Sequence, residues 1–150
     1  EEGFLLVIDR LKDLIVTAGG KNVAPQPIEQ RVTGSPLVAQ AALLGNRRPY
    51  LVMLVVPERL GGVPVGGEGQ ALATRLAAEV AGCLRDAARV ERPRRLAVVD
   101  EEFTVDGGLL TPTLKVRRRA VEQAYAALLD DVYAGRAGVE VPEPVEPAGA

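Results

Sequence analysis

Residues 37–56, LVAQAALLGNRRPYLVMLVV, contain two β-rich runs on either side of a polar segment. Residues 37–44 and 50–56 are mostly Val, Leu and Ala, and Gly, Asn and Pro in residues 45–49 favour a turn between them. This spacing predicts two antiparallel strands that pair with each other. A further short apolar run, residues 96–99, predicts another strand, so we expect a three-stranded sheet.

Three segments outside these strands have helical signals. Pro25 and Pro27 suit the first turn of a helix, and Gly-Ser-Pro at residues 34–36 ends it. Residues 72–90 carry Leu or Val at intervals of four, and residues 118–133 place apolar side chains on one side. The chain therefore predicts an α+β domain in which about three helices pack on the sheet.

The two ends of the chain complete this prediction. Residues 4–8 and 14–17 have strand character and flank the charged segment 9–13, which predicts a two-stranded hairpin. From Gly135 onward the composition turns to Gly, Pro, Val, Glu and Ala. We expect residues 1–134 to fold and residues 135–150 to be a disordered tail.

Composition excludes several classes of site. The 150 residues are 47% hydrophobic and 3% aromatic with a net charge of −2, which argues against nucleic-acid binding. Histidine is absent and Cys83 is the single cysteine, so Cys/His zinc sites are excluded, as are catalytic histidines unless another domain supplies them. We expect Cys83 to be a core residue of its helix and the compartment to be reducing.

The ends and the hydropathy of the chain bear on where the protein acts. No apolar run approaches the roughly 20 residues of a membrane span, and no signal peptide is visible. We expect a cytoplasmic protein, either free or peripheral to a membrane. The chain opens Glu-Glu-Gly without an initiator Met, which predicts a fragment of a longer protein.

Residues 108–119, GLLTPTLKVRRR, place Lys115 between a Thr-Pro-Thr turn and the start of the last helix. Pro112 restricts this loop, although an isolated loop lysine is usually only a surface charge. Arginines 117–119 lie at the N-terminus of the helix and aspartates 130–131 near its C-terminus, and both placements oppose the helix dipole. Either solvent screens these charges, or the arginines face an anion or another domain.

A second segment, IDRLKDLIVTAGGKNVAPQPIE at residues 8–29, lies about a hundred residues upstream. Its charged residues 9–13 alone are typical of a solvated turn. Gly19 and Gly20 allow backbone amides to approach an anion that Lys21 could neutralise, although the spacing differs from that of a P-loop.

In order and spacing, the two segments together resemble the C-terminal domain of AMP-forming acyl-CoA synthetases, the ANL superfamily. The form of the Lys115 segment, residues 108–119, is similar to that of bacterial long-chain fatty acid–CoA ligases, and the resemblance covers residues 3–133. It implies an enzyme that activates a fatty acid with ATP to an acyl-adenylate, releasing pyrophosphate. Such an enzyme then rotates its small lid domain and forms the CoA thioester.

The resemblance also implies roles for individual residues. Lys115 matches the catalytic lysine that reaches the α-phosphate and the carboxylate during adenylation. Arg10 matches the nucleotide-binding arginine that contacts the ribose hydroxyls, and Lys12 occupies the hinge.

For the second half-reaction, Gly19 and Gly20 match the face along which the pantetheine arm of CoA passes. Lys21 could contact one of its phosphates. Many relatives carry Ser where this chain has Ala24, so one helix-capping hydroxyl is lost.

The family implies partners that this chain does not contain. The large N-terminal domain would hold ATP, Mg²⁺ and the fatty acid, so we expect this chain alone to be inactive. We expect ATP and CoA as substrates, no metal ligands in this chain, no nucleic-acid partner and no transmembrane segment.

Two alternatives stay open. A relative with another acceptor, either a fatty acyl-AMP ligase or a carrier-protein adenylation domain, would share both motifs. A non-catalytic α+β module that binds a ligand or a partner would leave Lys115 and Arg10 as ordinary surface charges.

Overall fold

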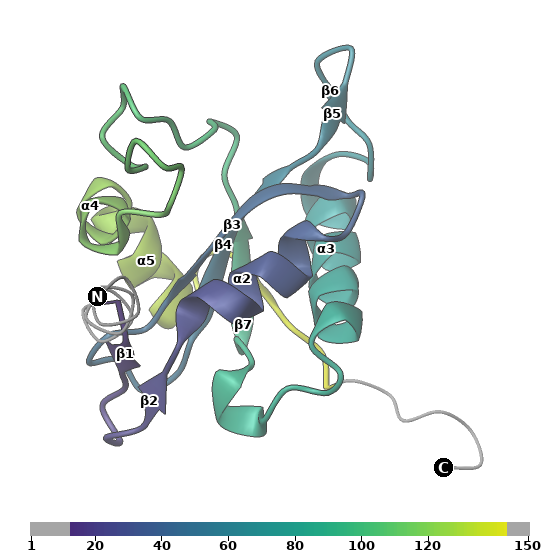
Figure 1. Cartoon of the computed structure of the whole chain (residues 1–150). Helices are drawn as coiled ribbons and strands as arrows, with labels where there is room; N and C mark the ends of the chain where they lie inside the picture. The colour runs from purple at the N-terminus through teal and green to yellow at the C-terminus, as the bar shows by residue number, and fades with distance from the viewer. Residues whose placement is uncertain (1–12, 144–150) are drawn as a thin grey trace.

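The computed structural model describes residues 13–143, and the two β-rich runs form neighbouring strands of its main sheet (Figure 1). β3 (Val38–Leu44) and β4 (Val52–Pro57) pair antiparallel, with Ala42 opposite Leu54. β7 (Arg95–Val98) lies parallel to β4 on its other side. The α+β class and the paired strands are confirmed.

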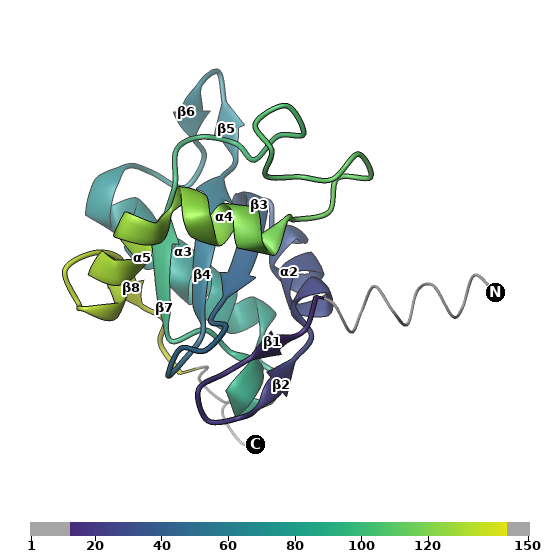
Figure 2. The same ribbon diagram turned by 90° about the vertical axis from the view of Figure 1, so that its left-hand side faces the viewer.

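Helices cover both faces of this sheet (Figures 1 and 2). α2 (Pro25–Thr33) and α3 (Gly69–Cys83) pack on one face, and α4 (Arg118–Ala124) and α5 (Ala126–Tyr133) pack on the other. Because side chains alternate along a strand, Leu43 and Met53 join the first core and Leu44 and Leu54 the second. β4 is therefore buried on both faces, which explains its continuous apolar run.

The N-terminal hairpin pairs β1 (Ile15–Val16) with β2 (Asn22–Val23). Its turn is closed by hydrogen bonds from Thr17 N–H to the Lys21 carbonyl (3.0 Å) and from Gly20 N–H to the Thr17 carbonyl (2.9 Å). Gly20 has a φ of 83°, which the turn requires and glycine adopts without strain. The predicted pairing of this strand with residues 4–8 lies outside the described residues.

One predicted helix is shorter than its apolar pattern. The long helix ends at Cys83 rather than at residue 90. The turn that follows is held by the Arg92 guanidinium, which donates to the Ala87 carbonyl at 3.0 Å and to the Arg85 carbonyl at 3.5 Å. The short helix η1 (Arg89–Glu91) follows. Cys83 is only half-buried, although it packs against the core cluster as expected.

The last helical segment is divided. Tyr125, at φ −112° and ψ 24°, separates α4 from α5, and its ring packs edge-on against Phe103 at 6.3 Å. α2 has Ala24 at its N-cap with no side-chain hydrogen bond, which confirms the lost cap. A small hairpin, β5 (Arg59–Leu60) with β6 (Val63–Pro64), forms within the glycine-rich segment before α3.

The sheet has a fourth strand that the sequence did not predict. β8 (Val139–Glu140) pairs antiparallel with β7, so the sheet order is β3-β4-β7-β8. The predicted disordered tail from residue 135 is therefore wrong for this part. Edge pairing satisfies backbone groups of Arg95 and Leu96, which a composition rich in Gly and Pro does not reveal.

Gly138 makes this edge strand possible, and its substitution gives a test. It has a φ of 74°, and a Cβ there would lie 2.6 Å from Leu96 O. Gly135 has a similar φ of 79° but open space around it. We expect Gly135→Ala to cost about 1–2 kcal/mol of unfolding free energy from backbone strain. Gly138→Ala should cost about 1–3 kcal/mol more because of the clash.

Urea denaturation of the two variants measures this difference. Equal losses would show that β8 does not hold Gly138 against Leu96.

Candidate active site

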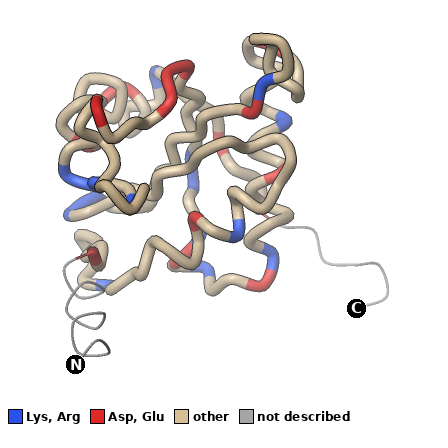
Figure 3. Tube along the Cα trace, turned by 45° about the horizontal axis from the view of Figure 1, so that its top comes forward, with Lys and Arg blue, Asp and Glu red and all other residues tan. Residues whose placement is uncertain are grey.

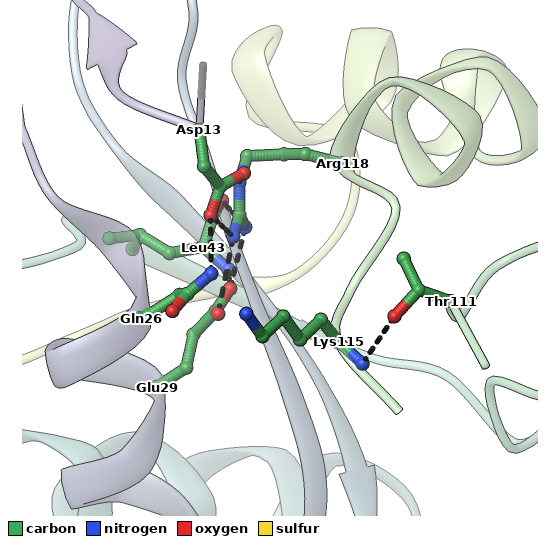
Figure 4. A network of polar contacts seen from close by, with 7 residues as sticks. All are labelled: Asp13, Gln26, Glu29, Leu43, Thr111, Lys115 and Arg118. Carbon is green, nitrogen blue, oxygen red and sulfur yellow. Dashed lines mark hydrogen bonds and ion pairs between the residues drawn. The ribbon is translucent and has the colours of Figure 1, made fainter. Parts of the chain in front are cut away.

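Lys115 lies at the end of a closed loop between β7 and α4. An antiparallel bridge between Leu110 and Val116 closes the base of this loop. Thr111 N–H donates to the Lys115 carbonyl (2.8 Å), and Lys115 N–H donates to the Thr111 hydroxyl (3.1 Å; Figure 4). Leu114 has a φ of 65°, a strained value for a branched side chain. The loop therefore holds the lysine backbone in one geometry at the cost of local strain.

A second attachment holds the start of this segment. The Gln40 side-chain amide donates to the Phe103 carbonyl at 2.9 Å and accepts from the Phe103 N–H at 2.7 Å. Gln40 lies on β3, so these two bonds fix the beginning of the segment that ends at Lys115 to the edge strand of the sheet.

The Lys115 side chain itself is exposed. Figure 4 shows it extending toward the side of α2 that carries Gln26 and Glu29. Within residues 13–143 its ammonium has no hydrogen-bond or ion-pair partner. It lines an open groove of about 420 Å³ between α2 and its own loop. An anchored backbone with an unengaged ammonium is suited to binding an anion presented from outside the domain.

Next to the lysine loop, Arg118 forms a buried cluster with two carboxylates (Figure 4). Its Nε and Nη2 each donate at 3.0 Å to the Asp13 carboxylate. Nη1 donates to Glu29 Oε2 at 2.6 Å and to the Leu43 carbonyl at 2.8 Å, and Nη2 to Glu29 Oε1 at 3.3 Å. All five N–H groups of the guanidinium are therefore bonded.

Burial and pairing act against each other in this cluster. Burial raises the pKa of Glu29, although the hydrogen bond and the charge of Arg118 oppose this. Burial alone would lower the pKa of Arg118, but the bonds to Asp13 and Glu29 outweigh it and raise the pKa. The guanidinium therefore stays charged, and the cluster carries one excess negative charge when both carboxylates are ionised.

The three arginines before and within α4 differ in their surroundings. Arg118 is buried, so solvent screening is wrong for its charge, and the anions that it faces are the Asp13 and Glu29 carboxylates of this chain. Arg117 is exposed and donates to the Gly108 carbonyl at 3.1 Å, and Arg119 is exposed. The helix-terminal aspartates are paired as well, Asp130 with Arg48 at 3.1 Å and Asp131 with Arg136 at 3.0 Å.

A second surface surrounds the turn between β1 and β2. Gly19, Gly20 and Lys21 are exposed there, and space is open beside both glycines. Gly19 and Lys21 line a groove of about 250 Å³ together with three arginines in and just after η1 (the η1 arginines): Arg89, Arg92 and Arg94. Glu143 pairs with Arg89 at 3.8 Å and with Arg92 at 3.4 Å, so one carboxylate offsets part of this charge. The groove therefore combines a bare backbone with a concentration of positive charge, although acidic and basic residues are interspersed elsewhere along the chain (Figure 3).

The structure describes the positions of some of the predicted site residues and not of others. Lys115 and the Gly19–Lys21 turn line separate grooves with no residue in common. Arg10 and Lys12 lie outside the described residues. The Arg118 cluster and the η1 arginines were not predicted. One signal was available, since Glu29 occupies a position on the buried stripe of α2 beside Ile28 and Val32.

Comparison with known proteins decides the family. The model of the AMP-binding enzyme C-terminal domain matches residues 12–137. The chain belongs to this family. It is 35% identical over 147 residues to the long-chain-fatty-acid–CoA ligase FadD15 of Mycobacterium tuberculosis, covering 89% of this chain and 24% of the ligase. Identity to the ligase ACSBG1 of Bos taurus is 31% over 163 residues, covering 88% and 22%. The domain thus spans about a quarter of the curated relatives it matches.

Solved structures agree in fold. The adenylation domain of carboxylic acid reductase from Segniliparus rugosus, in complex with AMP and a carboxylic acid, superposes with a TM-score of 0.73 at 29% identity, covering 85% of this chain and 21% of that one. The corresponding domain from Mycobacterium chelonae has a TM-score of 0.70 at 32% identity, covering 83% and 20%. No helix within residues 13–143 has both the length and the apolar content of a membrane span.

Proposed function

We propose that this domain is the mobile lid of a long-chain fatty acid–CoA ligase. The curated relatives carry this activity in their names, and the observation that supports it most is Lys115, whose backbone is anchored while its ammonium has no partner among residues 13–143. In the first half-reaction, the ammonium would stabilise negative charge as the fatty acid carboxylate attacks the α-phosphate of ATP and pyrophosphate leaves.

The large domain would supply the rest of this site. ATP, Mg²⁺ and the fatty acid would bind there, with Arg10 reaching the ribose from the lid. Among residues 13–143, no group of three or more His, Cys, Asp or Glu side chains gathers in a way that could hold a metal ion.

The second groove suits the thioester step. Rotation about Lys12 would replace the Lys115 face with the turn of Gly19, Gly20 and Lys21. Glycines leave room for the pantetheine arm, and the η1 arginines offer cations to the phosphates of CoA. The separation of the two grooves on one rigid domain supports a mechanism in which each half-reaction uses its own face.

Gly19→Leu tests this face. Gly19 lacks a positive φ and has open space around it, so leucine fits the isolated domain without strain. We expect acyl-adenylate formation to stay normal while thioester formation falls by about tenfold or more, since the added side chain blocks the approach of the thiol.

Gly82→Leu, an exposed glycine on α3 with equal space, is the matched control. A normal thioester rate in Gly19→Leu would remove the turn from the mechanism.

A carrier protein is the second candidate acceptor. The structural relatives include a carboxylic acid reductase solved as a didomain of the adenylation domain with its peptidyl carrier protein, with a TM-score of 0.70 at 28% identity. Product analysis of the full-length enzyme with a fatty acid, ATP and either CoA or a phosphopantetheinylated carrier protein decides between the acceptors. Acyl-CoA as the preferred product supports the ligase, and preferential loading of the carrier overturns it.

A further inference from the structure

We infer that Arg118 is a positioning residue, which fixes the Lys115 loop to the hinge through Asp13. The inference rests on the proposed function, because it gives the bond a role in adenylation. Asp13 directly follows Lys12, the proposed hinge residue, and Arg118 follows Lys115 by three residues. The ion pair therefore joins the proposed hinge to the loop that carries Lys115, across 105 residues of sequence.

The contacts of Arg118 make this connection stiff. Its side chain is only 8% exposed, and its two bonds to Asp13 form a parallel pair that restricts both distance and orientation. Glu29 and the Leu43 carbonyl hold the other side of the guanidinium to α2 and β3. A movement of Asp13 is thus transmitted to the start of α4 through the Arg118 side chain, which its hydrogen bonds hold in place.

The two half-reactions depend on this connection to different degrees. The turn of Gly19, Gly20 and Lys21 follows Asp13 through β1, so the backbone itself links this turn to the hinge. Lys115 is remote in sequence, and the Asp13–Arg118 bond is a direct route from the hinge to its loop. Adenylation should therefore be more sensitive to this bond than thioester formation.

Asp13→Asn in the full-length enzyme tests the inference. Asparagine keeps the shape of the side chain, and Glu29 still neutralises Arg118, so the variant should fold. We expect kcat for adenylation to fall about tenfold with a smaller change in KM for ATP, because the lysine arrives misplaced. Thioester formation from preformed acyl-adenylate should change less than twofold. Asp13→Glu, which restores a carboxylate, should recover part of the loss.

Two further variants separate the possible outcomes. Asp130→Asn removes a carboxylate from an exposed ion pair with Arg48 and should leave both rates unchanged. Adding Asp13→Asn to Lys115→Ala should cause no additional loss, since the effect acts through the lysine. Equal loss of both half-reactions in Asp13→Asn would reduce Arg118 to a structural role. Normal adenylation would overturn the inference.

Failure of the proposed function has a different signature. If the proposed function is wrong, the Lys115→Ala enzyme forms the acyl-adenylate at the normal rate, whatever the rate of the Asp13→Asn enzyme. If Lys115→Ala is slow and Asp13→Asn is normal, only the positioning inference fails.

Discussion

Replacing Lys115 with Ala in the full-length enzyme is expected to slow ATP–pyrophosphate exchange by about 10²–10³-fold, the usual cost of losing one preorganised charge-stabilising donor. The loop backbone should be unaffected, because its bonds to Thr111 use main-chain groups of residue 115. The loss should appear mainly in kcat, since the ammonium acts on charge that develops in the transition state.

The second half-reaction provides the internal control. Thioester formation from a preformed acyl-adenylate should survive the change, because the lid has then turned the Lys115 groove away. Arg119→Ala, an exposed cation four residues on, should leave exchange within about twofold of wild type, as surface substitutions usually do. Near-normal exchange in Lys115→Ala would contradict its role.

Replacing Arg118 with Met should destabilise the 150-residue chain by about 3–5 kcal/mol, the usual cost of removing one partner of a buried ion pair. Two carboxylates then remain, Glu29 at 9% and Asp13 at 20% exposure, without the four N–H donors that compensated them. Guanidinium chloride denaturation followed by circular dichroism measures the loss as a lower midpoint at an unchanged slope.

Second-site substitution distinguishes an unpaired charge from lost packing. Adding Glu29→Leu to Arg118→Met should recover part of the stability, because the buried charge leaves with it. Arg119→Met, at an exposed position of the same helix, should cost less than about 0.5 kcal/mol. Comparable losses in the two single variants would contradict the buried cluster.

Local patterns were sufficient for much of the fold. The β-rich runs at residues 37–44 and 50–56 predicted β3 and β4, and Pro25 with Gly34 located α2 to within a residue. These features depend on neighbours in sequence, so composition and spacing reveal them. The extent of α3 was overestimated because the apolar pattern continues past Cys83 into a turn, where Arg92 from the following loop donates to the Ala87 carbonyl.

The candidate site, like the fold, could be predicted from the sequence only in part. The spacing of the two motifs and the position of Lys115 could be recognised along the chain. The groove that Gly19 shares with Arg89, Arg92 and Arg94 could not be recognised, because only folding brings these residues together. The unexpected strand β8 likewise depends on an edge of β7 that only the assembled sheet presents.

By itself, the sequence determined the α+β class, the pairing of β3 with β4 and the loop that carries Lys115, since these follow from apolar runs and turn chemistry. Only the tertiary structure decided what Arg118 does. A charge at a helix start is indistinguishable along the chain from its neighbours Arg117 and Arg119. Burial between Asp13 and Glu29, which lie 105 and 89 residues away, makes it a structural centre of the site. The desolvation of a charge and the partners that compensate it are properties of three-dimensional packing.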